Sequence, residues 1–279
     1  MCIRDSLSTL DPELGSLVRD ELTRHGVDVL TGTRVEAVAR DGGRITVTGI
    51  HDGEAFSRTA DVVLVVVGVR PNTSLLTAAG ATTGAGGAVV VDEQMRTGLP
   101  HVWAAGDGVV THHRLLGITY LPLGTTAHKQ GRVAGENAIG GDTRFAGSLG
   151  TQVVKVFDVV AARTGLRDHE ATAAGLAPHS HTAIADDHKR YYPGATPVSI
   201  RITGDTNDGR LLGAQLVGSR GAEISKRVDT YATSLHHRMT VAAMSDLDLS
   251  YTPPLGSPWD AVQIATQAWE REARSLSRV

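Results

Sequence analysis

The chain has 279 residues, 41% of them hydrophobic and 20% charged, with a net charge of −3 at pH 7. These values describe a globular protein of one large or two ordinary domains, and they give no reason to expect nucleic acid as a partner. The longest apolar run, residues 62–67, is too short to cross a bilayer, and no secretory segment opens the chain, so a cytoplasmic protein without a membrane partner is expected. The single cysteine, Cys2, excludes a disulfide framework and a Cys-x-x-Cys redox pair.

The first elements are a helix and several short strands. Residues 1–9 are expected to be extraneous to the fold, because residues 1–6 do not look like the start of a domain. A helix begins at Asp11-Pro12-Glu13, where a capping residue, a proline and an acid follow one another, and it ends at Gly26. Strands are predicted next, the last of them continuously apolar as in a strand buried on both faces. They cover residues 27–30, 34–40, 44–48, 55–59 and 61–68.

The most informative stretch is residues 97–107, Thr-Gly-Leu-Pro-His-Val-Trp-Ala-Ala-Gly-Asp. A short apolar strand, residues 101–105, is predicted to run directly into Gly106 and the carboxylate of Asp107. Glycine at the carboxyl end of a strand lets a ligand approach the backbone, and a neighbouring carboxylate can accept hydrogen bonds from sugar or polyol hydroxyls. Gly-Asp alone is also typical of an ordinary turn. A helix is predicted over residues 124–138.

Taken together, these eleven residues resemble the second flavin-binding motif of the pyridine nucleotide-disulfide oxidoreductases, and the resemblance covers nearly the whole chain from about Leu10. It implies that Asp107 holds the ribityl chain of FAD and that the helix 124–138 points its positive N-terminus at the flavin. His128 matches a substrate-contacting histidine of the family; without the resemblance it would be read as a polar residue on a solvated helix face. The implied cofactor-binding residues are Thr97, Gly98, Ala104, Ala105, Gly106, Asp107, Leu123, Gly124 and Tyr251.

The resemblance also implies a domain order. Residues 10–72 would be the C-terminal part of an NAD(P)H-binding domain, residues 73–147 that of an FAD-binding domain, and residues 148–279 a dimerisation domain. The fold class is therefore α/β, with partial Rossmann-type domains, followed by α+β. The Gly-rich segment 84–87 follows no predicted strand and opens no helix, so it is interpreted as a loop and not as a dinucleotide-binding turn.

In the family, the dinucleotide-binding glycines and the redox cysteine would precede Leu10. The chain is therefore expected to be the C-terminal portion of a longer enzyme and inactive alone. The residue that distinguishes NADH from NADPH would also lie upstream.

Strands grouped with helices predict an α+β arrangement for residues 148–279. Composition changes at residues 145–150, a predicted linker. The predicted strands cover residues 152–160, 198–203 and 211–217, and the predicted helices residues 222–236, 241–246 and 261–274.

Two Tyr-Pro segments, residues 191–194 and 249–254, each place a phenol beside a rigid turn. Alone, such a tyrosine is usually a packed loop residue. Together with residues 164–165 and 226–229, however, they resemble the dimerisation domain of coenzyme A-disulfide reductases and related NADH oxidases. The resemblance implies a homodimer in which Tyr251 and Tyr191 are catalytic residues that reach the flavin and thiol site of the neighbouring subunit.

The implied activity passes hydride from NAD(P)H through flavin to a small-molecule disulfide of the coenzyme A type. The chain differs from the family pattern at one position, which leaves the electron acceptor open. Some coenzyme A-disulfide reductases bind their ligand with a lysine where this chain has Trp259. Another disulfide, a persulfide or oxygen, as in an NADH oxidase, remains an alternative, and so does a non-catalytic dimerisation fragment. No histidine group has the spacing of a metal site and no nucleophile elbow is present, so neither a metal nor hydrolase chemistry is expected.

Overall fold

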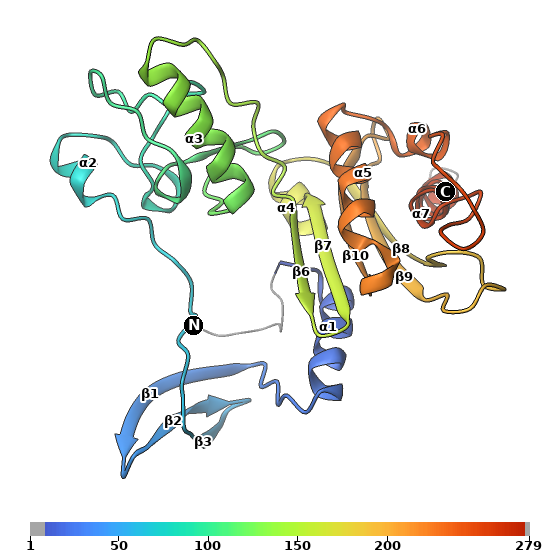
Figure 1. Ribbon diagram of the computed structural model, residues 1–279, viewed down its shortest axis with the longest axis horizontal. Coiled ribbons are helices and arrows are strands. Elements are labelled where there is room, and N and C mark those ends of the chain that lie inside the picture. Colours follow the sequence, from blue (N-terminus) through green and yellow to red (C-terminus); the bar gives the residue numbers. More distant parts are fainter. Residues whose placement is uncertain (1–8, 277–279) are drawn as a thin grey trace.

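The computed structural model describes residues 9–276, which form three successive parts (Figure 1). The first is a helix and a three-stranded antiparallel sheet: α1 (Pro12–Arg24), β1 (Thr33–Asp41), β2 (Arg44–His51) and β3 (Glu54–Ala60). The second contains α2 (Ser74–Ala78), the 3-10 turns η1 (Ala85–Gly87) and η2 (Gly106–Gly108), β4 (Thr111–His113), β5 (Gly117–Thr119) and α3 (Gly124–Ala138). The third contains β6 (Gln152–Val156), β7 (Val159–Gly165), α4 (Asp168–Ala173), β8 (Pro178–Asp186), β9 (Pro197–Asp205), β10 (Leu211–Ser219), η3 (Arg220–Ala222), α5 (Ile224–His236), α6 (Val241–Ser245) and α7 (Ala261–Leu276).

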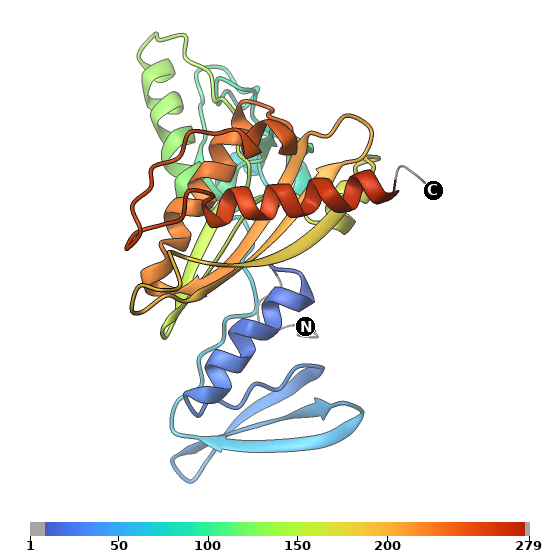
Figure 2. The same ribbon diagram turned by 90° about the vertical axis from the view of Figure 1, so that its right-hand side faces the viewer.

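The third part is built on a five-stranded antiparallel sheet with the strand order β6-β7-β10-β9-β8, called the interface sheet below. Side chains of successive residues in a strand point to opposite faces of a sheet. On β10, Leu216 therefore belongs to the core formed with α5, α6 and α7, whereas Val217 lies against α1 on the other face. Figure 2 shows α7 and α1 on different sides of this sheet. Because both faces are covered, β10 is buried from Leu211 to Gly218.

Helix α1 begins at Pro12, as its capping signals predict, but it packs against the third part of the chain and not against β1–β3. Leu14 and Val18 lie one turn apart on its apolar face and contact Ala161 of β7 and Val217 of β10. Just before the helix, Asp11 accepts a hydrogen bond from the side-chain amide of Gln215 at 2.7 Å. The first part is therefore attached to the interface sheet by a mixed apolar and polar contact.

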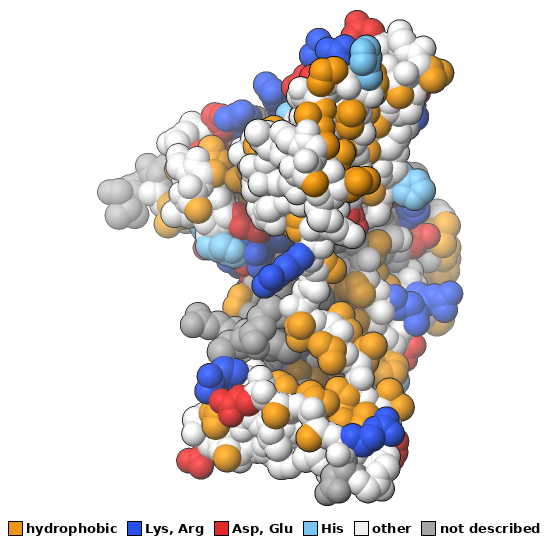
Figure 3. Space-filling view, turned by 90° about the vertical axis from the view of Figure 1, so that its left-hand side faces the viewer, with side chains coloured by type: hydrophobic (Ala, Val, Ile, Leu, Met, Phe, Trp, Pro, Cys, Tyr) orange, Lys and Arg blue, Asp and Glu red, His pale blue; other side chains and the backbone are white. Residues whose placement is uncertain are grey.

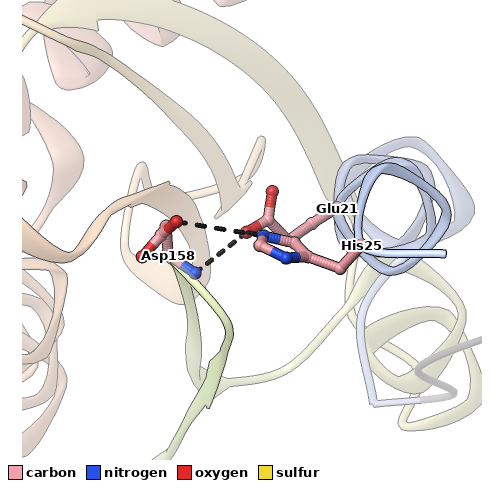
Figure 4. A group of neighbouring side chains, drawn as sticks. All are labelled: Glu21, His25 and Asp158. Carbon is pink, nitrogen blue, oxygen red and sulfur yellow. Dashed lines mark hydrogen bonds and ion pairs between the residues drawn. The ribbon is translucent and has the colours of Figure 1, made fainter. Parts of the chain in front are cut away.

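At its other end, α1 contacts the turn between β6 and β7 (Figure 4). The carboxylate of Glu21, which is fully buried, accepts a hydrogen bond from the backbone N–H of Asp158 at 2.9 Å. This bond outweighs the effect of burial and holds the pKa of Glu21 below its ordinary value. The ring of His25 stacks on Phe157 with centroids 3.9 Å apart, so charge and apolar area both stabilise this contact.

The predicted strand at residues 61–68 is wrong. The segment pairs with no strand among residues 9–276, and Val62, Leu64 and Val66 are 81, 84 and 75% exposed. An isolated strand leaves its backbone groups without partners, so an apolar pattern alone does not form one. The strand predicted at residues 27–30 is unpaired for the same reason. Figure 3, viewed from the side where α2 and β1 lie, shows apolar side chains gathered over this face of the molecule.

Other expectations near the domain boundary also need correction. The strand predicted over residues 152–160 turns back at Phe157, whose φ is 48°, and so becomes β6 and the start of β7. The segment 145–150 is not a free linker, since Phe145 is buried beside Val133 and the N–H of Ser148 donates to the carbonyl of His112 at 2.9 Å. The structure adds elements that the sequence did not predict, namely α2, β4, β5, α4 and β8.

Most helices match their predictions. Helix α3 has the predicted bounds, and α5, α6 and α7 each begin within two residues of the expected position.

Candidate functional site

The stretch 97–107 folds as a bend and a turn over residues 98–101 and runs into the 3-10 turn η2 at Gly106, and it does not form the strand predicted over residues 101–105. The only ladder contact within it is an isolated bridge between Arg96 and Trp103. Thr97 closes the turn: its hydroxyl donates to the carbonyl of Val102 at 2.9 Å, and its side chain is buried. Gly98 has a φ of 79°, a conformation that glycine adopts without strain. Thr97 and Gly98 thus shape the turn, and the cofactor contact predicted for them stays a prediction.

Gly106 brings Asp107 against helix α3. The N–H of Gly106 donates to Oε1 of Gln130 at 3.0 Å, while Nε2 of the same buried Gln130 donates to the carbonyl of Val110 at 3.2 Å. Gly106 has a φ of 85°, and a Cβ at this position would lie 3.6 Å from the Cβ of Ala127. One glutamine side chain therefore fixes the turn beside the first two turns of α3, and Asp107 is left exposed next to it.

The N-terminus of α3 lies beside this turn. Leu123 is its N-cap and Gly124 its first residue, and the first turn contains no acidic side chain that would neutralise the positive end of the helix dipole. A Cβ at Gly124 or Gly108 would meet no atom within 4 Å, so the backbone is open to a ligand at both positions. The region therefore offers three groups suited to a ligand. An exposed carboxylate can accept hydrogen bonds from polyol hydroxyls, the open glycine backbone allows close approach, and the helix N-terminus favours an anionic group.

Tyr120 is part of this region, although the sequence analysis did not single it out. Its hydroxyl donates to the backbone carbonyl of Asp107 at 3.1 Å, and its ring packs over Gly86, where a Cβ would lie 2.7 Å from the ring. Burial, and then the charge of Asp107, raise the pKa of Tyr120. The Gly-rich segment 84–87 is therefore a turn beneath this tyrosine that leads into no helix, as its interpretation as a loop requires.

A cleft separates α3 from the interface sheet and α5. It has a volume of about 600 Å³ and adjoins a second cleft of about 490 Å³ that shares Thr125, Lys129, Thr151, Asp229 and Ala232. Two predicted cofactor residues, Leu123 and Gly124, line the larger one. His128 is exposed on α3, next to Lys129, and its substrate contact stays a prediction. The residues that line the larger cleft are Leu123, Gly124, Thr125, Lys129, Thr151, Gln152, Val153, Ser225, Val228, Asp229 and Ala232.

The two predicted catalytic tyrosines are on loops that contact each other. Tyr191 is in the loop of residues 187–196 between β8 and β9, and Tyr251 is in the loop of residues 246–260 between α6 and α7; these are called the tyrosine loops below. The N–H of Lys189 donates to the carbonyl of Pro253 at 3.2 Å, which joins the two loops directly. Tyr191 is 71% and Tyr251 44% exposed, so both rings are accessible at the surface of a single chain.

One group among the described residues could in principle hold a metal ion. Glu21, His25 and Asp158 bring one ligand atom each to within 4.8 Å of one another (Figure 4). Both oxygens of Glu21 are already engaged, however: Oε1 with the N–H of Asp158 and with Nε2 of His25, and Oε2 with Nη1 of Arg24 at 2.5 Å. We therefore assign this group to the contact between α1 and the β6–β7 turn.

Two sequence profiles match the chain. One, described as pyridine nucleotide-disulphide oxidoreductase, covers residues 3–131, and the other, described as the dimerisation domain of the same proteins, covers residues 151–261. The chain belongs to the pyridine nucleotide-disulphide oxidoreductases. The resemblance drawn from residues 97–107 and from the tyrosine segments is thereby confirmed, and so is the fold class, α/β followed by an α+β dimerisation domain.

Three relatives illustrate the range of the family. A CoA-dependent NAD(P)H sulfur oxidoreductase of Pyrococcus furiosus is 32% identical and aligns with 90% of this chain and 55% of its own. A coenzyme A disulfide reductase of Staphylococcus aureus is 27% identical over 91% of this chain and 56% of its own. The solved structure of an NAD-dependent persulfide reductase from A. fulgidus is 36% identical, covers 96% of this chain and 49% of that one, and has a TM-score of 0.90. The chain thus spans about half the length of the relatives it matches.

A TM-score of 0.90 over 96% of the chain shows that the solved relative shares the overall fold of this chain. Within the described residues, no helix of the chain is long and apolar enough to cross a membrane.

Proposed function

We propose that this chain is the C-terminal portion of an FAD-dependent NAD(P)H:disulfide oxidoreductase of the coenzyme A-disulfide reductase type. The observation that carries the proposal is the Gly106–Asp107 turn, which Gln130 holds beside the N-terminus of α3 at the edge of the cleft facing the interface sheet. FAD bound there would accept hydride from the reduced nicotinamide and deliver electrons to a disulfide.

The residues around this turn fit FAD. Asp107 is exposed and would accept hydrogen bonds from ribityl hydroxyls, while the open backbone at Gly106, Gly108 and Gly124 would allow the cofactor close to the chain. The positive end of α3, without an acidic residue in its first turn, would stabilise negative charge on the reduced flavin. Ala104, Ala105 and Leu123 are half-buried on either side of this surface and complete its proposed lining.

We assign the domains as the sequence indicates: residues 10–72 to the NAD(P)H-binding domain, residues 73–147 to the FAD-binding domain and residues 148–279 to dimerisation. The profile matched at residues 151–261 supports the last of these. In the proposed homodimer, Tyr251 and Tyr191 approach the flavin and thiol site of the partner subunit, with the phenol of Tyr251 acting on the disulfide side and His128 contacting the substrate.

The names of the relatives support a disulfide or persulfide acceptor, since they include a coenzyme A disulfide reductase and a persulfide reductase. Trp259 is 53% exposed at the end of the second tyrosine loop, where an indole offers a flat apolar surface in place of a cationic group. A persulfide or a disulfide with less negative charge than coenzyme A is therefore the second candidate for the acceptor.

The chain itself is expected to bind neither cofactor tightly. Within residues 9–276, no Gly-rich turn connects a strand to a helix N-terminus, so the backbone groups that normally bind a pyrophosphate are missing from the described part. We expect the purified chain to be colourless and not to oxidise NADH, as measured by absorbance at 450 and 340 nm. A stoichiometric flavin spectrum would contradict the proposal that this is the C-terminal portion only.

In the enzyme with its upstream half in place, Asp107→Ala is expected to lower the affinity for FAD by roughly tenfold or more, because a charge-assisted hydrogen bond contributes about 1.5–3 kcal/mol. Equilibrium dialysis of FAD against the apoenzyme measures this change. Asp61→Ala is the matched control, since it removes an exposed carboxylate that only pairs with Arg44. Equal FAD affinity of the Asp107→Ala variant and the parent would show that the Asp107 carboxylate does not contribute to FAD binding.

A further inference from the structure

Arg227 is a buried cation on α5, within the segment 226–229 that marks the dimerisation domain, and the proposed function gives it no role. The residue is 8% exposed. A guanidinium carries a permanent charge and five N–H donors, so its burial is unfavourable unless several acceptors surround it. The acceptors of Arg227 therefore show which parts of the fold require it.

One acceptor belongs to each tyrosine loop. Nη2 of Arg227 donates to the backbone carbonyl of Asp187, the first residue of the loop that contains Tyr191, at 2.7 Å. The same guanidinium forms a two-point contact with the carboxylate of Asp260, the last residue of the loop that contains Tyr251, at 2.9 and 3.3 Å. Its Nη1 also donates to the carbonyl of Ala222, just before α5. One planar group thus contacts the bases of both loops and the helix on which it is placed.

Each of these loop bases is itself rigidly held. The carboxylate of Asp187 accepts hydrogen bonds from the N–H and the hydroxyl of Thr196 at 2.8 and 3.1 Å, which closes the first loop. Asp260 caps α7 by accepting from the N–H of Val262 at 2.9 Å. The two loops are also joined by the hydrogen bond from Lys189 to Pro253. A group that holds both Asp187 and Asp260 in place therefore holds the two loops as one unit.

We propose that Arg227 is a positioning residue that sets the placement of both tyrosine loops and so delivers Tyr251 and Tyr191 together to the active site of the partner subunit. The catalytic consequence rests on the proposed function, whereas the structural part does not. Lysine cannot replace Arg227, because a single ammonium group lacks the planar fork that reaches the Asp187 carbonyl and the Asp260 carboxylate simultaneously.

The structural part is tested on the chain itself by hydrogen–deuterium exchange of the loop amides. In Arg227→Lys and Arg227→Met, exchange in residues 188–194 and 251–257 is expected to rise by roughly tenfold or more, as the loops open locally, while the interface sheet stays protected. Asp260→Asn keeps an oxygen to cap α7 but weakens the bond to Arg227, and it should loosen the same amides if Arg227→Met does not fold. Lys226→Met, at an exposed neighbour paired only at the surface with Asp229, is the control and should change neither loop.

The catalytic part is tested in the enzyme with its upstream half in place, by separating the two half-reactions. Arg227→Lys is expected to leave flavin reduction by NAD(P)H unchanged and to slow reoxidation by the disulfide by roughly tenfold. A merely structural defect would lower FAD occupancy and both half-reactions together. Tyr251→Phe, measured in parallel, reports on the proposed function alone.

The outcomes are distinct. Loop amides that exchange as slowly in Arg227→Lys and Asp260→Asn as in the parent would overturn the positioning role. Loosened loops with normal reoxidation in Arg227→Lys but slow reoxidation in Tyr251→Phe would overturn its catalytic consequence while leaving the proposed function in place. Normal reoxidation in both variants would overturn the role of the tyrosine loops as well.

Discussion

Glu170→Gln is expected to lower the free energy of unfolding by on the order of 3 kcal/mol at pH 7. The carboxylate of Glu170 lies between two largely buried arginines, with Oε2 2.7 Å from Nη2 of Arg163 and Oε1 2.8 Å from Nη2 of Arg167. Burial alone would raise the pKa of Glu170, but hydrogen bonds from Arg167 and Arg163 and the charge of Arg163 lower it to about 2. Removing this charge leaves two buried cations without their shared partner.

The pH dependence of this contribution has a definite sign. Because the pKa of Glu170 in the folded protein, about 2, lies below its ordinary value of 4.5, the carboxylate stabilises the fold fully above about pH 5. That stability is lost as the pH falls through 4.5 towards 2. The difference between parent and variant should therefore shrink to less than half of its neutral value at about pH 3.

Urea denaturation at several pH values measures both effects. The matched control is Glu93→Gln, which removes a carboxylate that pairs with Arg144 at 3.4 Å between side chains that are 54 and 65% exposed. A surface pair of this kind contributes under about 1 kcal/mol. A Glu170→Gln variant no less stable than the Glu93→Gln control, or a difference that does not depend on pH, would contradict the buried network.

This network also shows what sequence patterns leave out. Nη1 of Arg163 donates to the carbonyl of Thr9 at 3.1 Å, across 154 positions of the chain, so the ion-pair network of the third part also holds the segment just before α1. The capping residues around Pro12 predicted where α1 begins, because those signals are local. Its packing against the interface sheet depends on contacts between distant segments, which no local period encodes.

The difference between local signals and contacts with distant segments also explains why the strand predicted at residues 61–68 does not form. Their apolar, β-branched composition predicts a strand, but a strand exists only beside a neighbour that completes its hydrogen bonds. The prediction for α3, between Leu123 and Gly140, was correct because a helix forms its hydrogen bonds within its own segment and needs no neighbouring strand.

The candidate site was predictable in part. Gly106 and Asp107 stand out as a glycine followed by a carboxylate, and the resemblance to the family identifies them. The sequence does not indicate the buried contacts of Gln130 and Arg227, since a polar residue in a helix is usually exposed and only its burial reveals its partners. Tyr120 was missed for the same reason, because its contact with the Asp107 carbonyl arises from the β4–β5 hairpin.

The chain is expected to form a homodimer at micromolar concentration, because the third part leaves large apolar side chains exposed outside its own core. Val153 on β6 and Leu255 and Trp259 in the second tyrosine loop are 53, 76 and 53% exposed. Helices cover β10 on both faces of the interface sheet but leave the middle of β6 exposed. An obligate interface of this kind buries more than roughly 2,000 Å² in total. Sedimentation velocity across a concentration series measures the association, and a monodisperse monomer at every concentration would contradict it.

Within that dimer, Tyr251→Phe is expected to slow disulfide turnover by roughly tenfold to a hundredfold, because the variant loses a hydroxyl able to donate a proton or hydrogen bond to the departing thiolate. Flavin reduction by NAD(P)H should be unchanged, since the phenol acts only on the disulfide side. Tyr192→Phe is the matched control: this tyrosine is in the other loop, its ring is 5.4 Å from that of Tyr191, and it is given no catalytic role. Stopped-flow measurement of the two half-reactions separates the effects. Equal turnover of the Tyr251→Phe and Tyr192→Phe enzymes would show that the Tyr251 hydroxyl takes no part in the reaction across the subunit boundary.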